Sequence, residues 1–287
     1  MSRLLLLLLP VVVLIGLLPT GASASSDPAT RTAVFAGVGE WVDIYDQTIK
    51  DPQFVVDQAV AHGVQTIYVE TSNYHSPADV MYPDQIREMI SLAHANNIKV
   101  VPWYLPGYKR IALDRRRFAA AVAVGDPDLP IDGLGVDIEA DIVSNRQLRS
   151  DRAAAMVAWV RATYPDLAIA GIVPRDALAW WRIFPYAAIR ANTDAMLPMC
   201  YTSRYLTPAQ TTAMTAACVT TIQEQTGDPA APVHVIAGVT DFLKPRLLIA
   251  AARGAKSAGA LGFSLYNLET TTPTDWRAVD VWRTPAG

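Results

Sequence analysis

The sequence is poor in the residues that build metal, nucleotide and nucleic-acid sites. Its 287 residues include two cysteines and four histidines, and neither a Cys-x-x-Cys nor a His-Glu-x-x-His motif occurs, so we expect no metal site and no cofactor. No glycine-rich turn suited to a nucleotide follows an apolar strand. The formal net charge is -3, which gives no basic surface for nucleic acid.

Long apolar runs are scarce as well, and the one that stands out lies at the N-terminus. Arg3 precedes an apolar stretch that extends to Leu18, and Ala22-Ser23-Ala24 fits a small-x-small cleavage site. The run is shorter than the roughly 20 residues of a membrane span. We therefore predict a secretory signal peptide at residues 1–24, a polar leader at residues 25–31 and an exported protein without a membrane partner after cleavage. An uncleaved membrane anchor is the alternative.

The two cysteines, Cys200 and Cys218, suit an exported protein, because disulfides persist in oxidising compartments. If Met199 and Tyr201 face the interior of a barrel, strand alternation turns Cys200 outward. Cys218 lies about three turns into the helix expected next. A disulfide is favoured, and two buried thiols in the helix–strand interface are the alternative.

Short apolar segments alternate with helical patterns along the rest of the chain. The expected strands are residues 32–38, 66–70, 98–103, 134–138, 167–172, 195–201, 233–239 and 260–266. The expected helices begin at signals such as Asp51-Pro52 and Thr207-Pro208. This alternation predicts one α/β domain, a (β/α)8 TIM barrel over residues 32–287. An open doubly wound sheet is the alternative.

Residues 131–139, Ile-Asp-Gly-Leu-Gly-Val-Asp-Ile-Glu, read as a buried strand that ends in two acids. Alternation places Gly133, Gly135, Asp137 and Glu139 on one face, which we expect to point into the barrel. Active sites of such barrels lie at the C-terminal ends of the strands. Two carboxylates on one strand face repel each other, which raises the pKa of one toward that of an acid catalyst. The alternative is a strand end whose acids cap a helix or pair with an arginine.

Other expected strand ends carry acids, aromatic rings and amides. These side chains suit a carbohydrate site, because sugars offer hydroxyl groups for hydrogen bonds and flat C–H faces for stacking. The candidate residues are Asp43, Glu70, Trp103, Tyr104, Tyr201, Asp241, Tyr266 and Asn267. Core packing of the rings and loop capping by the two aspartates are the alternatives.

The strand at residues 131–139 resembles the fourth-strand signature of the chitinase-like family 18 glycoside hydrolases, Asp-Gly-x-x-x-Asp-x-Glu. Met199-Cys200-Tyr201 is similar to the sixth-strand Met-x-Tyr of that family, and the chain also resembles exported actinobacterial barrel proteins described as glycosidases. The resemblance implies Glu139 as general acid and Asp137 as the residue that orients the acetamido group of the substrate. It implies that Tyr201 hydrogen-bonds this acetamide and that Met199 lies at the substrate.

The chain departs from the family pattern at three positions. Gly135 stands where the family usually has a middle Asp, and Thr202 stands where it usually has an Asp after the Tyr. The eighth-strand Trp of the family is absent, and Tyr266 is the nearest substitute. These departures leave open another amino sugar, another glycan or lost activity.

The sequence therefore predicts an exported glycoside hydrolase that acts on an extracellular or cell-wall polysaccharide, with amino-sugar polymers included. The resemblance implies a mechanism in which the substrate acetamide is the nucleophile. A plain two-carboxylate mechanism, with Asp137, Asp43 or Asp241 beside Glu139, is the alternative. A catalytically inactive barrel that binds glycan or protein at the cell envelope is the competing function.

Overall fold

Eight parallel strands close into a barrel in chain order in the computed structural model, which describes residues 27–284. The strands are β1 (Gly37–Val42), β2 (Thr66–Asn73), β3 (Lys99–Leu105), β4 (Gly133–Asp137), β5 (Ala168–Pro174), β6 (Ala195–Met199), β7 (His234–Gly238) and β8 (Gly262–Tyr266). Closure comes from pairing of β1 with β8, in which Gly37 lies opposite Gly262. The predicted (β/α)8 barrel is confirmed.

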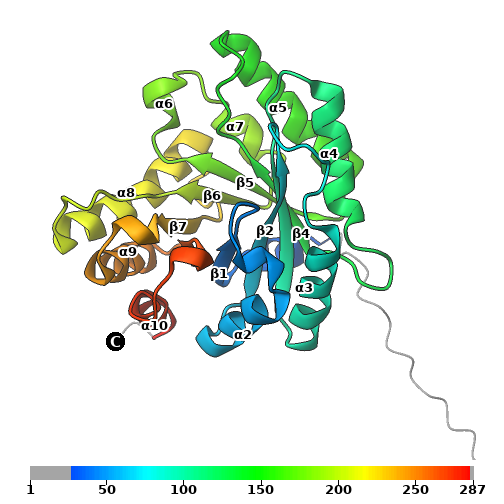
Figure 1. The fold of residues 1–287 in the computed structure, drawn as a ribbon. Coiled ribbons are helices and arrows are strands. Elements are labelled where there is room, and N and C mark those ends of the chain that lie inside the picture. The colour runs from blue at the N-terminus through cyan, green and yellow to red at the C-terminus, as the bar shows by residue number, and fades with distance from the viewer. Residues whose placement is uncertain (1–26, 285–287) are drawn as a thin grey trace, which may run out of the picture.

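Helices surround the barrel on its outside, as Figure 1 shows. They are α1 (Pro28–Ala33), α2 (Pro52–His62), α3 (Pro83–Ala95), α4 (Ile111–Ala123), α5 (Arg146–Thr163), α6 (Ala177–Trp180), α7 (Tyr186–Arg190), α8 (Pro208–Thr226), α9 (Pro245–Ser257) and α10 (Arg277–Arg283). The predicted helix starts are confirmed, because Asp51 caps α2 and Thr207 caps α8 through side-chain acceptors. None of the helices within residues 27–284 is long and apolar enough to span a membrane.

The N-terminal part of the domain differs from the prediction. A strand was expected at residues 32–38, but α1 occupies the first part of this range and β1 begins only at Gly37. The side chain of Asp27 accepts hydrogen bonds from the backbone N–H groups of Ala29 and Thr30, and Pro28 opens the helix. This cap outweighs the strand propensity of the segment that follows. The predicted signal peptide lies outside the described residues, and α1 takes up the end of the predicted leader.

Two apolar layers fix the direction of every side chain on the strands. The outer layer lies between strands and helices, and it holds Leu134 and Val136 of β4. The inner layer fills the barrel and consists of Phe35, Trp41, Tyr68, Val101, Trp103, Ala168, Ala170, Ile172, Ala195, Leu197 and Ile236. Residues on β4 that alternate with Leu134 and Val136 therefore point into the barrel.

The predicted disulfide is confirmed. Cys200 lies just after β6, and its sulfur bonds to that of Cys218 on α8, with the two Cα atoms 6.1 Å apart. Both cysteines are buried in the outer layer, as the outward orientation of Cys200 requires. The bridge ties the C-terminal end of β6 to the helix that covers it.

Candidate active site

Strand β4 delivers two carboxyl groups to the mouth of the barrel because its inward face carries no other side chain. A Cβ atom added to Gly135 would lie 2.6 Å from the Cβ atom of Trp103, so only glycine fits beside this ring. The residue that departs from the family signature thus makes room for Trp103. Asp137 and Glu139 follow on the same face, and both line the cavity at the mouth.

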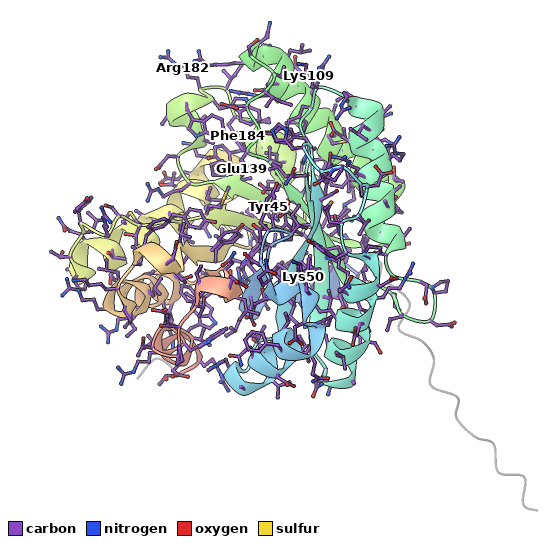
Figure 2. The ribbon with its side chains drawn as sticks, viewed as in Figure 1. Tyr45, Lys50, Lys109, Glu139, Arg182 and Phe184 are labelled. Atoms are coloured by element: carbon purple, nitrogen blue, oxygen red, sulfur yellow. A yellow bond between two sulfur atoms is a disulfide. The ribbon has the colours of Figure 1, made fainter. Side chains whose placement is uncertain are left out.

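This cavity has a volume of about 250 Å³ and opens at the C-terminal ends of the strands. Figure 2 shows Glu139 and Tyr45 near the middle of the ring of helices. The lining residues are Trp41, Asp43, Tyr45, Glu70, Asn73, Trp103, Leu105, Asp137, Glu139, Ile172, Met199, Tyr201, Ile236 and Tyr266. Acids and aromatic rings are thus gathered where barrels of this type hold their active sites.

Asp137 is buried in the wall of the cavity, and hydrogen bonds do not fully replace the water that its carboxyl group has lost. Its residue is 5% exposed, and its Oδ1 atom has no hydrogen-bond partner among the described residues. Burial raises the pKa of Asp137 well above its usual range, and the negative charges of Glu139 and Glu70 raise it further. An acceptor kept free in this way is available to a donor on a ligand.

Glu139 differs from Asp137 because it lies beyond the end of β4, where its residue reaches solvent through the open mouth. Desolvation of the carboxyl group nevertheless raises the pKa of Glu139. A carboxyl group that is accessible and holds its proton more tightly than usual can donate that proton to a substrate.

A second acidic pair lies at the mouth two to three strands away around the barrel, where Asp43 follows β1 and Glu70 lies on β2. Asp43 Oδ2 accepts a hydrogen bond of 2.6 Å from the Tyr266 hydroxyl group, and Glu70 Oε1 accepts one of 3.1 Å from Asn73 Nδ2. Burial first, and then repulsion and hydrogen bonding from Asp43, raise the pKa of Glu70 to about 8. The mouth therefore contains two acidic pairs, which interact through Glu70 and Asp137.

Aromatic rings form the floor of the cavity. The Trp41 ring stacks on Tyr68 with centroids 4.4 Å apart and meets Trp103 edge-on at 5.9 Å. The Trp103 Nε1 atom is buried and has no hydrogen-bond partner among the described residues. Tyr201 lies beside Tyr266, with ring centroids 6.0 Å apart. Flat rings and one free donor suit the C–H faces and hydroxyl groups of a sugar.

Three predicted site residues do not line this cavity. Tyr104 points outward, and its hydroxyl group donates a 2.7 Å hydrogen bond to Asp114 Oδ1 in the helical layer. Asp241 lies exposed on the short 3-10 helix after β7. Asn267 is buried behind the mouth, where its Nδ2 atom donates to Asp46 Oδ2 at 2.9 Å. Strand alternation and the turns after β7 and β8 explain these corrections.

Several residues of the cavity were not predicted from the sequence. Trp41 was missed because the first strand was placed too early, so its inward position on β1 was not recognised. Tyr45 follows β1 and Asn73 is the last residue of β2, and the Tyr45 hydroxyl group accepts a 2.7 Å hydrogen bond from Asn73 Nδ2. Leu105, Ile172 and Ile236 complete the lining, and as apolar residues they gave no chemical signal.

A smaller hollow adjoins the mouth on the side of α4. It measures about 170 Å³ and is lined in part by Tyr74, Lys109 and Arg110. Burial and the negative charges of Asp141 and Glu139 raise the pKa of Tyr74, which places the hollow near Glu139.

A larger hollow, of about 550 Å³, lies at the opposite end of the barrel. Its acids are already paired: Asp194 accepts from Arg31 Nε at 3.0 Å, and Asp228 accepts from Arg190 Nε at 3.0 Å. Paired charges at the N-terminal ends of barrel strands are typical of stability and not of catalysis. Among residues 27–284, no group of three or more histidine, cysteine, aspartate or glutamate residues is arranged to hold a metal ion.

Comparison with known proteins agrees on the fold. No protein-family model matches the sequence, and no curated protein does. A chitinase from Chromobacterium violaceum superposes with a TM-score of 0.61 at 14% identity, over 88% of this chain and 100% of that chain. A group IV chitinase from Ostrinia furnacalis gives 0.64 at 12% identity, over 87% and 100%. A variant of a GH18 chitinase from Cycas revoluta, in complex with (GlcNAc)4, gives 0.63 at 13% identity, over 86% and 100%. The chain thus has the chitinase-like TIM-barrel fold.

Proposed function

We propose that the protein is an exported glycoside hydrolase that acts on an amino-sugar polysaccharide. The observation that carries the proposal is the pair Asp137 and Glu139 in the mouth of a barrel with the fold of chitinases. The similar structure from Cycas revoluta was solved in complex with (GlcNAc)4, which supports a glycan ligand. Export rests on the sequence of residues 1–24, which fits a signal peptide.

Glu139 is the general acid in this proposal. Its raised pKa keeps a proton available, and its position at the open mouth lets it reach the oxygen of a glycosidic bond. As that oxygen leaves with the proton, positive charge develops on the sugar ring at C1. The ionised form of Glu139 then accepts a proton from the water that completes hydrolysis.

Asp137 has the second role. Its free Oδ1 atom accepts a hydrogen bond from the N–H group of a substrate acetamide, which orients the acetamide oxygen for attack on C1. Tyr201, two residues after the end of β6, lines the same cavity and hydrogen-bonds the acetamide. Trp41 and Trp103 supply the ring floor that a Trp on the eighth strand supplies in the family this chain resembles.

The alternative, a barrel that binds glycan without cleaving it, is favoured by one observation. Gly135 replaces the middle acid of the family signature, so the proton on Asp137 has no carboxylate below it to move to. This alternative shares the cavity with the proposed hydrolase. A barrel that only binds glycan differs from the proposed hydrolase in that it shows no turnover of a bound glycan.

The test is the release of reducing ends from a β-1,4-linked N-acetylglucosamine tetramer by the mature protein. We expect Glu139→Gln to lower turnover by about 100-fold or more, the low end of general acid catalysis. Glu88→Gln on α3, an exposed position, is the matched control and should keep full turnover. Binding of the tetramer without cleavage by the native protein would support the alternative. Equal turnover in both variants would assign the acid role elsewhere.

A further inference from the structure

The cavity at the mouth is lined by four carboxyl groups and by no lysine, arginine or histidine. These groups are Asp43 and Glu70 at the ends of β1 and β2, and Asp137 and Glu139 after β4. A sugar made neutral by acetylation needs hydrogen-bond partners but not this number of acids. The number of acids in this cavity needs a separate explanation.

The four acids are not neutralised by their neighbours. None of them takes part in an ion pair within residues 27–284. Glu70 is affected by the negative charge of Asp43, and Asp137 by those of Glu139 and Glu70. Lys109 and Arg110 line the adjoining hollow and not this cavity, and Figure 2 shows Arg182 toward the edge of the molecule. Ionisation of one acid is therefore opposed by the others, and a cation in the cavity would favour the ionised forms.

A second observation points to a hydrogen-bond donor in the same place. The Oδ1 atom of Asp137 is buried, unpartnered among the described residues, and belongs to a side chain that lines the cavity. Unsatisfied buried acceptors are rare in folded proteins, and one that faces a cavity is expected to pair with a ligand. The cavity thus offers a free acceptor in addition to carboxyl groups that no ion pair compensates.

We propose that this cavity binds a sugar that carries a free, protonated amino group, held by Asp43, Glu70 and Asp137. The substrate class is a de-N-acetylated or partly de-N-acetylated amino-sugar polysaccharide. This inference rests on the proposed glycoside hydrolysis. The ammonium group takes the place of the acetamide at Asp137, so the two-carboxylate mechanism, with Asp43 beside Glu139, replaces attack by an acetamide oxygen. An ammonium group has three N–H donors and a full charge, whereas an acetamide has one N–H donor and no charge. The faces of Trp41 and Trp103 add cation–π attraction nearby.

The test measures binding, so that it does not depend on cleavage. In a Glu139→Gln background, β-1,4-linked tetramers of glucosamine, N-acetylglucosamine and glucose are titrated by calorimetry at about pH 6, where an aliphatic amine is protonated. The three ligands share a backbone and differ only in the group at C2. We expect the glucosamine tetramer to bind about tenfold or more tightly than the other two, as charge-assisted hydrogen bonds imply.

Two further variants assign the effect to the acidic pair. Addition of Glu70→Gln, or of Asp43→Asn, should remove the preference for the glucosamine tetramer over the other two tetramers. Glu88→Gln is the matched control and should keep the preference, which excludes a general charge effect. Circular dichroism and thermal unfolding of each variant check that it folds.

The outcomes separate this inference from the proposed function. If the N-acetylglucosamine tetramer binds as tightly as the glucosamine tetramer, or if Glu70→Gln and Asp43→Asn both leave the preference unchanged, the inference is overturned and the hydrolase proposal stands. If none of the three tetramers binds, the proposed function fails and the inference fails with it.

Discussion

Two buried aspartates at opposite ends of the barrel have opposite surroundings. Asp194, just before β6, is 7% exposed, and its carboxyl group accepts from Arg31 Nε at 3.0 Å and from the Ile169 backbone N–H at 2.8 Å. Arg161 donates a further hydrogen bond to it. Asp137, at the end of β4, is 5% exposed and keeps one oxygen without a partner among the described residues.

The difference shows how this fold divides structural and chemical roles. A buried carboxylate costs free energy unless ion pairs and hydrogen bonds replace the lost water. At the N-terminal end of the strands this cost is offset for Asp194, so the residue holds α1, α5 and β5 together. At the mouth it is not offset for Asp137, so the fold carries a cost there that a ligand can relieve.

The largest expected effect concerns the paired end of the barrel. Asp194→Asn should lower the free energy of unfolding by about 3 kcal/mol, because it leaves Arg31 and Arg161 without their common anion. Urea unfolding of the mature protein measures this change. Turnover per folded molecule should be unchanged, because Asp194 lies at the opposite end from the cavity. A decrease in the free energy of unfolding of less than about 1 kcal/mol would mean that the ion pairs of Asp194 contribute little to stability. The contrast with Asp137 would then not hold.

The chemical part of the mouth was predictable from sequence because it depends on a local rule. In residues 131–139 one face of the strand is apolar and the other ends in acids, so alternation alone placed Asp137 and Glu139 inside the barrel. The same rule fixed the outward direction of Cys200 and hence the disulfide. Both faces of the sixth strand are apolar, so there the direction of Cys200 followed only from the condition that Met199 and Tyr201 face the interior.

Strand β3 shows where this rule fails. A parallel barrel strand is buried on both faces, so apolar residues occupy every position. The sequence then does not show which of the alternate residues face the barrel interior. Trp103 and Tyr104 were therefore indistinguishable in sequence, although one lines the cavity and the other bonds to Asp114. The predicted start of β1 was wrong for a related reason. An apolar segment next to a helix cap can continue as helix or strand.

The second prediction tests whether the mouth carries an energetic cost. Asp137→Asn should raise the free energy of unfolding at neutral pH by about 1 kcal/mol, because it removes an uncompensated buried carboxyl group without changing its size. The same change should lower turnover of the N-acetylglucosamine tetramer by at least about tenfold, because it alters the acceptor for the acetamide. Urea unfolding and a reducing-end assay provide the two measurements. Loss of stability in this variant would mean that Asp137 is compensated like Asp194.

The smallest effect concerns the pH dependence of stability at the mouth. The pKa of Glu70 is raised to about 8 in the folded protein, whereas an unfolded glutamate titrates near about 4.3. Between these values the folded protein holds a proton that the unfolded chain has lost, so stability falls as the pH rises through this window. Glu70→Gln should therefore reduce the loss of stability between about pH 5 and about pH 8. We expect a reduction on the order of 0.5 kcal/mol, well below the single-site limit, because Asp137 and Asp46 also have raised pKa values and still contribute.

Urea unfolding at both pH values measures this change in the pH dependence of stability, with Glu88→Gln as the control that should match the native protein. An unchanged pH dependence in Glu70→Gln would mean that the β1–β2 side of the mouth is compensated, and that the uncompensated charge belongs to Asp137 and Glu139 alone.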